Sequence, residues 1–218
     1  MNQRKPILIA TKNPGKLREA VAVLGDLGVA FVTLADFDEL PDAVEDGDSF
    51  AANAEAKARH YSRLTAYWTL ADDSGLEVDA LDGAPGVHSA RYAGGQCDPQ
   101  ANNARLVAEL AGIPPEERTA RFRCAVALAD GDRILATASG VIEGRIIDTP
   151  RGRNGFGYDP HFLVPELGIT TAEMPPEQKN RLSHRGNALR AIAPALARLL
   201  GDSAEEAGEP PGQSHLNP

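Results

Sequence analysis

The chain has 218 residues, 42% of them hydrophobic and 24% charged, and this length can bury one core without any dividing repeat or linker, so we expect one domain over residues 1–200. The net charge of −9 argues against broad binding to nucleic acid, although a few local cations can still hold a small phosphorylated ligand. No segment approaches the roughly 18 uninterrupted apolar residues of a membrane span, and the first residues lack the apolar core of a secretory signal, so we expect a cytoplasmic protein.

The first part of the chain alternates apolar runs with helical patterns. Residues 7–10 are typical of a buried strand, and a turn then leads to a helix with Leu17, Val21 and Leu24 on its apolar side. A second strand is expected at 30–34. This order predicts a strand, loop and helix unit at the start of the fold.

A second helix should begin at Asp48 or Ser49, either of which can cap it. Asn53 and Lys57 are four residues apart on this helix and can both face a cleft, whereas Glu55 points elsewhere.

Two adjacent carboxylates, Asp72 and Asp73, stand beside Ser74 and Gly75 between two apolar segments. We expect a tight turn here, with the carboxylate pair at a strand end, where it can hold a hard cation. The alternative is an ordinary turn in which the Asp and Ser side chains cap backbone N–H groups.

The second half of the chain predicts a helix, a hairpin and a final helix. Asp98 followed by Pro99 is typical of a helix start. The buried positions of this helix are expected to be Leu106, Val107 and Leu110. The runs 121–129 and 133–141 form a hairpin around Asp130 and Gly131.

A final amphipathic helix should start at Ser183, and residues 201–218 are expected to be a disordered tail because they have almost no apolar content. Strands mixed with helices, including an antiparallel pair, predict an α/β fold in which helices pack on a mixed sheet. Cys97 and Cys124 lack a metal-binding spacing and are predicted to be packing residues.

The loop between the first strand and first helix has the composition of an anion site. Exposed N–H groups and the helix dipole favour an anion there, with Thr11 and Asn13 bonding phosphate oxygens and Lys12 or Lys16 supplying charge. A solvated helix cap is the alternative. The predicted triphosphate-binding residues are Thr11, Lys12, Asn13, Pro14, Gly15 and Lys16.

Three further clusters have complementary chemistry. Glu45 and Asp46 add carboxylates before the second helix, although acids there are often only a solvated face. In residues 154–160, glycines allow close approach to a flat ligand, an aromatic ring can stack on a base and Asp159 can accept from a ring N–H, unless the aromatics simply anchor the loop. Residues 179–186 concentrate cations that suit a carbonyl oxygen or a phosphate, and His184 is assigned recognition or orientation.

In their joint order, these motifs resemble the inosine triphosphate pyrophosphatase family, over about residues 7–200. The resemblance implies a long central mixed sheet flanked by helices, two lobes with a cleft between them, and a homodimer. It also implies Mg²⁺-dependent hydrolysis of inosine, deoxyinosine and xanthosine triphosphates (ITP, dITP and XTP) to the monophosphate and pyrophosphate.

The resemblance also implies roles for single residues. Asp73 would bind metal and activate water with Asp72 beside it as a helper, and Glu45 would bind metal, with Asp46 competing for that assignment. The implied substrate contacts are Ser74, Phe156, Gly157, Tyr158, Asp159, Lys179, His184 and Arg185.

Base selectivity would follow from the 6-oxo group of these purines, which accepts from Lys179 or Arg185 where adenine presents a donor. Two other interpretations remain open. A related pyrophosphatase could act on modified pyrimidine or methylated nucleotides with the same phosphate chemistry. The chain could also be a nucleotide-binding regulator without turnover.

Overall fold

The computed structural model describes residues 6–95 and 97–206, and its core is a seven-stranded mixed sheet in the order β2-β1-β3-β4-β5-β6-β7. The strands are β1 (Ile7–Ile9), β2 (Phe31–Thr33), β3 (Trp68–Val78), β4 (Thr119–Asp130), β5 (Arg133–Ile146), β6 (Phe162–Val164) and β7 (Ile169–Thr170). The helices are α1 (Pro14–Leu24), α2 (Phe50–Thr65), α3 (Pro99–Glu109), α4 (Pro176–Leu182) and α5 (His184–Glu206). The predicted α/β class is confirmed. In the ranges described, no helix is both long and apolar enough to cross a membrane.

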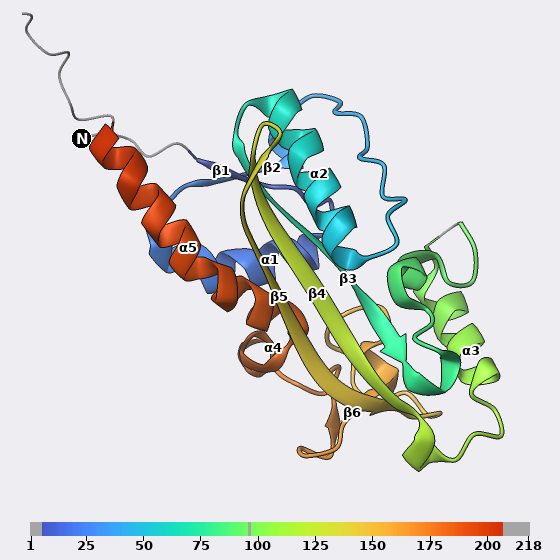
Figure 1. The fold of residues 1–218 in the computed structure, drawn as a ribbon. Coiled ribbons are helices and arrows are strands. Elements are labelled where there is room, and N and C mark those ends of the chain that lie inside the picture. Colours follow the sequence, from blue (N-terminus) through green and yellow to red (C-terminus); the bar gives the residue numbers. More distant parts are fainter. Residues whose placement is uncertain (1–5, 96, 207–218) are drawn as a thin grey trace, which may run out of the picture.

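The β4–β5 hairpin is the long axis of the molecule (Figure 1). Its strands pair antiparallel from Asp130 and Arg133 down to Thr119 and Arg145. Gly131, in the connecting turn, has a φ of +58°, which glycine adopts without steric cost. The predicted hairpin is therefore confirmed, and it is longer than the sequence pattern suggested.

Helices cover both faces of the sheet at the upper end of the hairpin, with α1 and α5 on one face and α2 on the other (Figure 1). The alternation of strand side chains divides β1 accordingly. Ile7 and Ile9 join a core with Leu24 and Leu196, whereas Leu8 joins a core with Phe50 on α2.

A separate apolar core occupies the lower end, below α2 and beside α3. Its buried members include Leu76, Leu106, Phe122, Ile146 and Phe162. β3 and β4 contribute to the cores at both ends, so these two strands connect an upper and a lower lobe.

The expected turn at Asp72 to Gly75 is wrong, because these residues lie inside the continuous strand β3. Every residue from Thr69 to Val78 has a partner in β4. Gly75 is instead required by close packing, since a Cβ there would lie 2.4 Å from Ser89 Oγ, on the short helix η4 (Gly86–Arg91).

The helix starts follow local signals, but other details differ. Ser49 caps α2 and Asp98 caps α3, as predicted. Val21 is 43% exposed and so does not belong to the buried side of α1, contrary to expectation. Cys97 is exposed rather than packed, whereas Cys124 is buried.

The C-terminal helix is longer than expected. α5 continues to Glu206, so residues 201–206 are helical and not a disordered tail. Residues 207–218, the remainder of that predicted tail, lie outside the described residues. The short helix α4 was not predicted, and it carries Lys179.

Candidate active site

A cavity of about 720 Å³ opens between the two lobes. It is bounded by the loop before α1, the segment before α2, the middle of β3, η4, residues 156–159 and the start of α5. The predicted site residues that line it are Thr11, Lys12, Asn13, Lys16, Glu45, Asp73, Ser74, Phe156, Gly157, Tyr158, Asp159, Lys179, His184 and Arg185. Segments far apart in the sequence thus converge on one hollow of nucleotide size.

The two predicted triphosphate-binding residues that do not line the cavity, Pro14 and Gly15, lie in the first turn of α1. Asn13 caps this turn, and its Oδ1 accepts from the N–H groups of Gly15 at 2.8 Å and Lys16 at 3.3 Å. The alternative of a helix cap therefore describes the Asn13 side chain in this structure. Thr11 supports the cap, because its Oγ1 accepts from the Asn13 N–H at 3.1 Å.

The two lysines of this loop point to different places. Lys12 makes an exposed ion pair with Asp42 at 2.5 Å, at the rim of the cavity. Lys16 turns inward, and its Nζ lies 2.9 Å from Asp72 Oδ2. Lys16 is therefore the more deeply placed cation of the loop.

Asp72 and Asp73 point to opposite faces of β3, as consecutive strand residues do. Asp73 faces α2 and the cavity, where the Asn53 amide donates to its Oδ2 at 3.0 Å and the Ser74 N–H donates to its Oδ1 at 2.9 Å. Burial raises the pKa of Asp73, and this outweighs the opposing effects of Asn53, Lys57 and nearby Lys16. A carboxyl with a raised pKa beside a cavity is suited to accept a proton.

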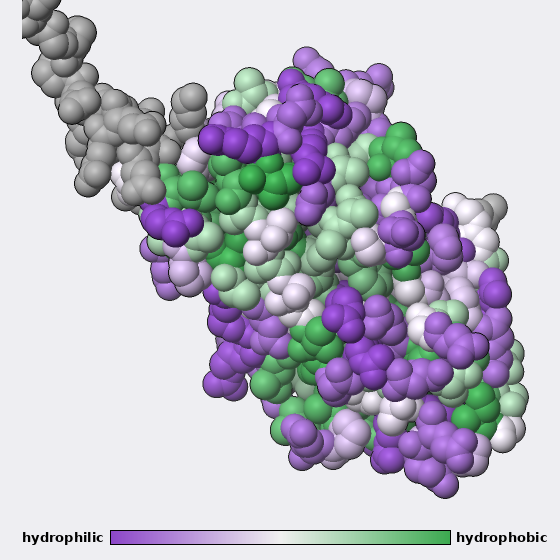
Figure 2. Space-filling model, viewed as in Figure 1, coloured by the Kyte–Doolittle hydropathy of each residue, from purple (hydrophilic) through white to green (hydrophobic). Residues whose placement is uncertain are grey.

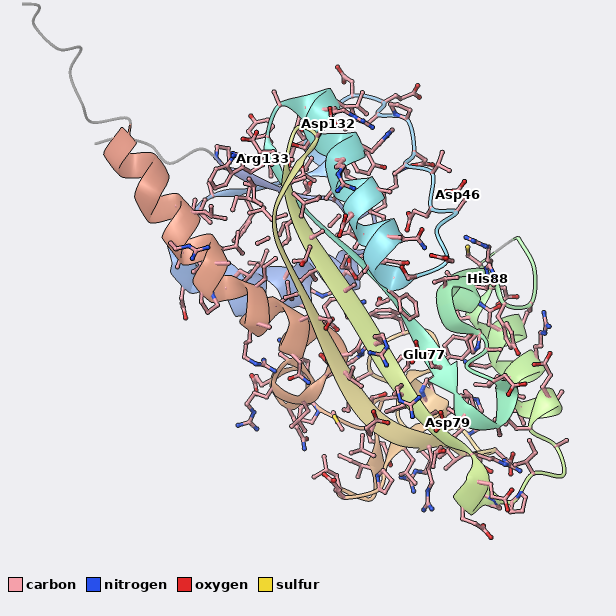
Figure 3. The ribbon with its side chains drawn as sticks, in the orientation of Figure 1. Asp46, Glu77, Asp79, His88, Asp132 and Arg133 are labelled. Atoms are coloured by element: carbon pink, nitrogen blue, oxygen red, sulfur yellow. The ribbon has the colours of Figure 1, made fainter. Side chains whose placement is uncertain are left out.

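Lys57 and Glu45 form an ion pair of 2.8 Å next to Asp73, and Lys57 also donates to the main-chain carbonyl of Asp72 at 3.0 Å. Burial opposes the charge on Lys57, but Asp72 and Glu45 together raise its pKa. Asn53 and Lys57 thus both face the cleft, as their spacing predicted. Glu45 lines the cavity, whereas Asp46 is exposed on the loop before α2 (Figure 3).

Asp72 faces α1 and α5 and is the centre of a buried ionic network. Its Oδ2 accepts from Lys16 and from Arg185 Nε at 3.1 Å. The other guanidinium nitrogens of Arg185 donate to Glu19 at 2.7 Å and to Ser74 Oγ at 2.8 Å. Burial works against ionisation of Asp72, yet Lys16 and Arg185 hold its pKa far below the usual range. All three nitrogens of Arg185 therefore have protein partners.

The aromatic loop (residues 154–159) is organised by the carboxylate of Asp159. Its Oδ2 accepts from the Phe156 N–H at 2.8 Å and from Lys179 Nζ at 2.6 Å, and its Oδ1 accepts from Thr171 at 2.8 Å. Lys179 Nζ also lies 5.0 Å from the centre of the Phe156 ring, which remains 39% exposed. Asp159 thus orders the loop that presents Phe156, instead of offering a free carboxylate.

His184 is buried at the start of α5, and its ring stacks on Phe122 with centroids 4.9 Å apart. Burial, together with Arg185 and Lys179, lowers the pKa of His184 well below its ordinary value, so the ring is neutral near pH 7. Its Nδ1 is buried and has no hydrogen-bond partner among the described residues. The role of His184 in recognition or orientation stays a prediction.

Residues 7–195 match the model of the Ham1 family. The chain belongs to the Ham1 family. It is 52% identical to the dITP/XTP pyrophosphatase of Geobacter sulfurreducens over 85% of this chain and 94% of the relative. It is 49% identical to the dITP/XTP pyrophosphatase of Geobacillus kaustophilus, over 90% and 97%.

Solved structures agree with this assignment of the Ham1 chain. A HAM1 protein from Coxiella burnetii has a TM-score of 0.81 and 40% identity, and covers 89% of this chain and 99% of its own. A nucleoside-triphosphatase / dITP/XTP pyrophosphatase from Mycobacterium abscessus has a TM-score of 0.71 and 45% identity, over 88% and 99%. The resemblance drawn from the sequence motifs is therefore confirmed.

Some residues at the site of this Ham1 chain were not singled out from sequence. Glu19 binds Arg185, and its place three positions after Lys16 on an amphipathic helix was an available signal. Asn102 and Phe122 also line the cavity, but they reach it only through packing between elements distant in sequence.

Proposed function

We propose that this Ham1 chain hydrolyses deaminated purine nucleoside triphosphates, namely ITP, dITP and XTP, to the monophosphate and pyrophosphate. The observation that carries this proposal is that Asp73, Lys16 and Phe156 border one cavity of about 720 Å³. A carboxyl, a cation and an exposed aromatic face are what hydrolysis, phosphate binding and base stacking each require. The relatives named dITP/XTP pyrophosphatase support the same substrate class.

The triphosphate would lie near Thr11, Lys12, Asn13 and Lys16, with the first turn of α1 behind it. The helix dipole at this end favours negative charge. Phosphate oxygens would compete with Asp72 for Lys16 and with Asp42 for Lys12. The exposed partner, Asp42, is the easier of the two to displace, because water screens its ion pair.

The reaction would begin with attack of water on the α-phosphorus. A P–O bond forms to the water oxygen, the bond from the α-phosphorus to the bridging oxygen breaks, and that oxygen leaves with pyrophosphate. Asp73 would orient the water and accept its proton. Lys57, 3.0 Å from the Asp72 carbonyl, would stabilise charge that develops at the phosphates.

The donor set suits Mg²⁺ bound together with substrate. In the part of the chain that the structure describes, no group of three or more His, Cys, Asp or Glu side chains could hold a metal by themselves. Mg²⁺ is commonly held by one or two carboxylates plus substrate phosphates, and Asp73 and Glu45, which both line the cavity, would supply those carboxylates. The ion would lower the negative charge that opposes attack.

Base selection would depend on the aromatic loop and α4. A purine stacked on Phe156 would present its 6-oxo acceptor toward Lys179, whose ammonium has three donors and lies 2.6 Å from Asp159. Arg185 is less suited to donate to the base, because its nitrogens are engaged by Asp72, Glu19 and Ser74. Ser74, Gly157, Tyr158 and His184 would complete the walls around the substrate.

We further infer a single domain over residues 1–200, from the length of the chain, and a location in the cytoplasm, from its composition. The family resemblance implies that it works as a homodimer. Light scattering would test the oligomeric state directly. Hydrolysis of modified pyrimidine or methylated nucleotides and binding without turnover are the competing functions.

A panel of nucleoside triphosphates with detection of pyrophosphate, with and without Mg²⁺, tests the proposal. We expect release from ITP, dITP and XTP well above that from ATP. Asp73→Asn should lower kcat by about 10²–10⁴-fold because the proton acceptor is lost. Asp132→Asn, at the far end of the hairpin (Figure 3), is a matched control expected to keep full activity.

Equal release from all triphosphates would contradict the proposed selectivity. A wild-type kcat in folded Asp73→Asn would contradict the proposed role of that carboxylate as proton acceptor. Binding of ITP with no pyrophosphate at any Mg²⁺ concentration would favour a regulator.

A further inference from the structure

The aromatic loop is attached to both lobes. On one side, Asp159 joins it to Lys179 on α4. On the other side, the Tyr158 hydroxyl donates to the main-chain carbonyl of Ser89 at 2.7 Å, and the Asn103 amide on α3 donates to the carbonyl of Gly157 at 3.0 Å. The loop therefore depends on η4 and α3 as well as on its own contacts.

Two consecutive residues of helix α3 hydrogen-bond to two different segments beside the cavity, the segment after Ser89 and the aromatic loop. Asn102 is buried, and its side chain accepts from the Ala93 N–H at 2.7 Å and donates to the Ala90 carbonyl at 3.0 Å. These contacts fix the segment that follows Ser89. Asn103, the next residue, points about 100° further around the helix and contacts the aromatic loop instead.

Two glycines leave the backbone around Phe156 with conformational freedom that the internal bond from the Phe156 N–H to Asp159 only partly removes. Gly155 and Gly157 adopt φ values of +77° and +61°, on either side of Phe156. Glycine has more conformational freedom than any other residue, so hydrogen bonds from neighbouring elements add to the bond with Asp159 in holding the aromatic ring in place. Asn103 supplies one of these bonds at the position directly after Phe156.

Asn103 is poorly explained by stability alone. Its Oδ1 is buried and has no hydrogen-bond partner within the described ranges. A buried polar atom without a partner costs stability, and an apolar side chain of similar size would avoid that cost. The Asn103 amide therefore donates to Gly157 while its oxygen is unpaired, which offsets part of the stability that the bond contributes.

We infer that Asn103 is a positioning residue that sets the base-stacking face of Phe156 through the Gly157 carbonyl, although it does not itself line the cavity. This inference rests on the proposed function, because it assigns Phe156 to a purine base. Losing the bond should weaken binding of the base, while the chemistry at Asp73 is unaffected.

The test replaces Asn103 by Leu, which keeps the volume and removes the donor. We expect KM for ITP with Mg²⁺ to rise about fivefold, the effect of one neutral hydrogen bond, with kcat within about twofold of wild type. The melting temperature should change little, because removal of the unpaired oxygen offsets the loss of the bond to Gly157. Asn103→Gln retains a donor and should keep KM closer to wild type than Asn103→Leu does.

Ser62→Ala is the matched control. The Ser62 hydroxyl also donates to a main-chain carbonyl between two elements, that of Tyr67 at 2.7 Å, but it lies outside the cavity. This variant should lose stability with no change in KM. A wild-type KM in Asn103→Leu would overturn the inference, and so would a raised KM accompanied by a loss of stability like that of Ser62→Ala.

Calorimetric titration of each variant with ITP in the absence of Mg²⁺ separates this inference from the proposed function. If wild type binds ITP in this titration but releases no pyrophosphate at any Mg²⁺ concentration, the proposed function fails. A weaker Kd in Asn103→Leu would then still support the inference. If wild type neither binds nor hydrolyses any of the purine triphosphates, both are overturned.

Discussion

Two ionic networks lie along β3, one at the cavity and one at the open lower end of the sheet. Lys16 and Asp72 are 2.9 Å apart, with side-chain exposures of 19% and 12%. Arg121 and Asp79 are also 2.9 Å apart, with exposures of 26% and 43%. Figure 3 shows Asp79 and Glu77 at the lower end of β3, and the same region of Figure 2 is strongly hydrophilic.

Equal distances do not mean equal energies in these two networks. The Coulomb energy of a pair scales inversely with the effective dielectric constant, which is far lower in a partly buried site than in water. In the buried network, removing one partner leaves the others desolvated and uncompensated, whereas water can replace a lost partner in the exposed one. The comparison predicts that the same substitution, Asp to Asn, has very different effects at positions 72 and 79.

The largest effect is expected for Asp72→Asn. The substitution leaves Lys16 without its carboxylate and Arg185 with only Glu19 as an acidic partner. We expect the free energy of unfolding to fall by about 3–5 kcal/mol, measured by denaturant titration, as for other broken buried pairs. A loss below about 1 kcal/mol, the size typical of exposed pairs, would show that burial does not distinguish the two networks.

Lys179→Met should have an intermediate effect on the free energy of unfolding. It removes the charge of a buried lysine that pairs with Asp159 but keeps an apolar side chain of similar length. Asp159 would still accept from the Phe156 N–H and from Thr171, so we expect a loss of about 1–3 kcal/mol in unfolding free energy. The ratio of kcat/KM for ITP over ATP should also fall by about tenfold or more. An unchanged ratio would count against Lys179 as the residue that recognises the base.

The features predicted correctly from sequence are those set by local chemistry. The turn at Asp130 and Gly131 fixed the hairpin, and the caps Ser49 and Asp98 fixed two helix starts. Such signals need only a few neighbouring residues, so they survive without knowledge of the tertiary structure. Most of the site residues that the family motifs named line the cavity.

The prediction of a turn at Asp72 and Asp73 was wrong because acidic residues, serine and glycine occur both in turns and in strands that line a functional site. Pairing with β4 stabilises the extended backbone, and the two carboxylates then point to opposite faces. The cavity therefore receives Asp73, while Asp72 organises Lys16 behind it. Local propensity cannot reveal this, because the partner strand begins more than 40 residues later, at Thr119.

The roles of Arg185 and Asp159 could not be separated from sequence for a related reason. Arginine suits a phosphate or a carbonyl oxygen and aspartate suits a ring N–H, but each is largely satisfied here by protein partners from distant elements. A motif indicates which groups come to a site, and only the fold shows which of them remain free to contact a ligand.

Asp79→Asn should have the smallest effect, and its pH dependence sharpens the comparison. Hydrogen bonds from Arg121 and Thr119 lower the pKa of Asp79, so the folded state binds this proton less readily than the unfolded state. The stabilisation is therefore present above the unfolded pKa and is lost as pH falls through the folded pKa. Water screens this exposed carboxylate, so we expect wild type and variant to differ by only about 0.2–1 kcal/mol at pH 7, and less at high salt.

Denaturant titrations of wild type and Asp79→Asn at pH 7, and at acidic pH values down to the limit of folding, measure this difference. The two curves should converge as pH falls, because protonation removes the charge that the substitution also removes. A gap that widens on acidification would mean that the protonated form of Asp79 stabilises the folded state. The two networks would then differ in the sign of their contribution to stability and not only in its size. A gap at pH 7 as large as that of Asp72→Asn would show that an ion pair whose carboxylate is 43% exposed can contribute as much stability as a buried pair.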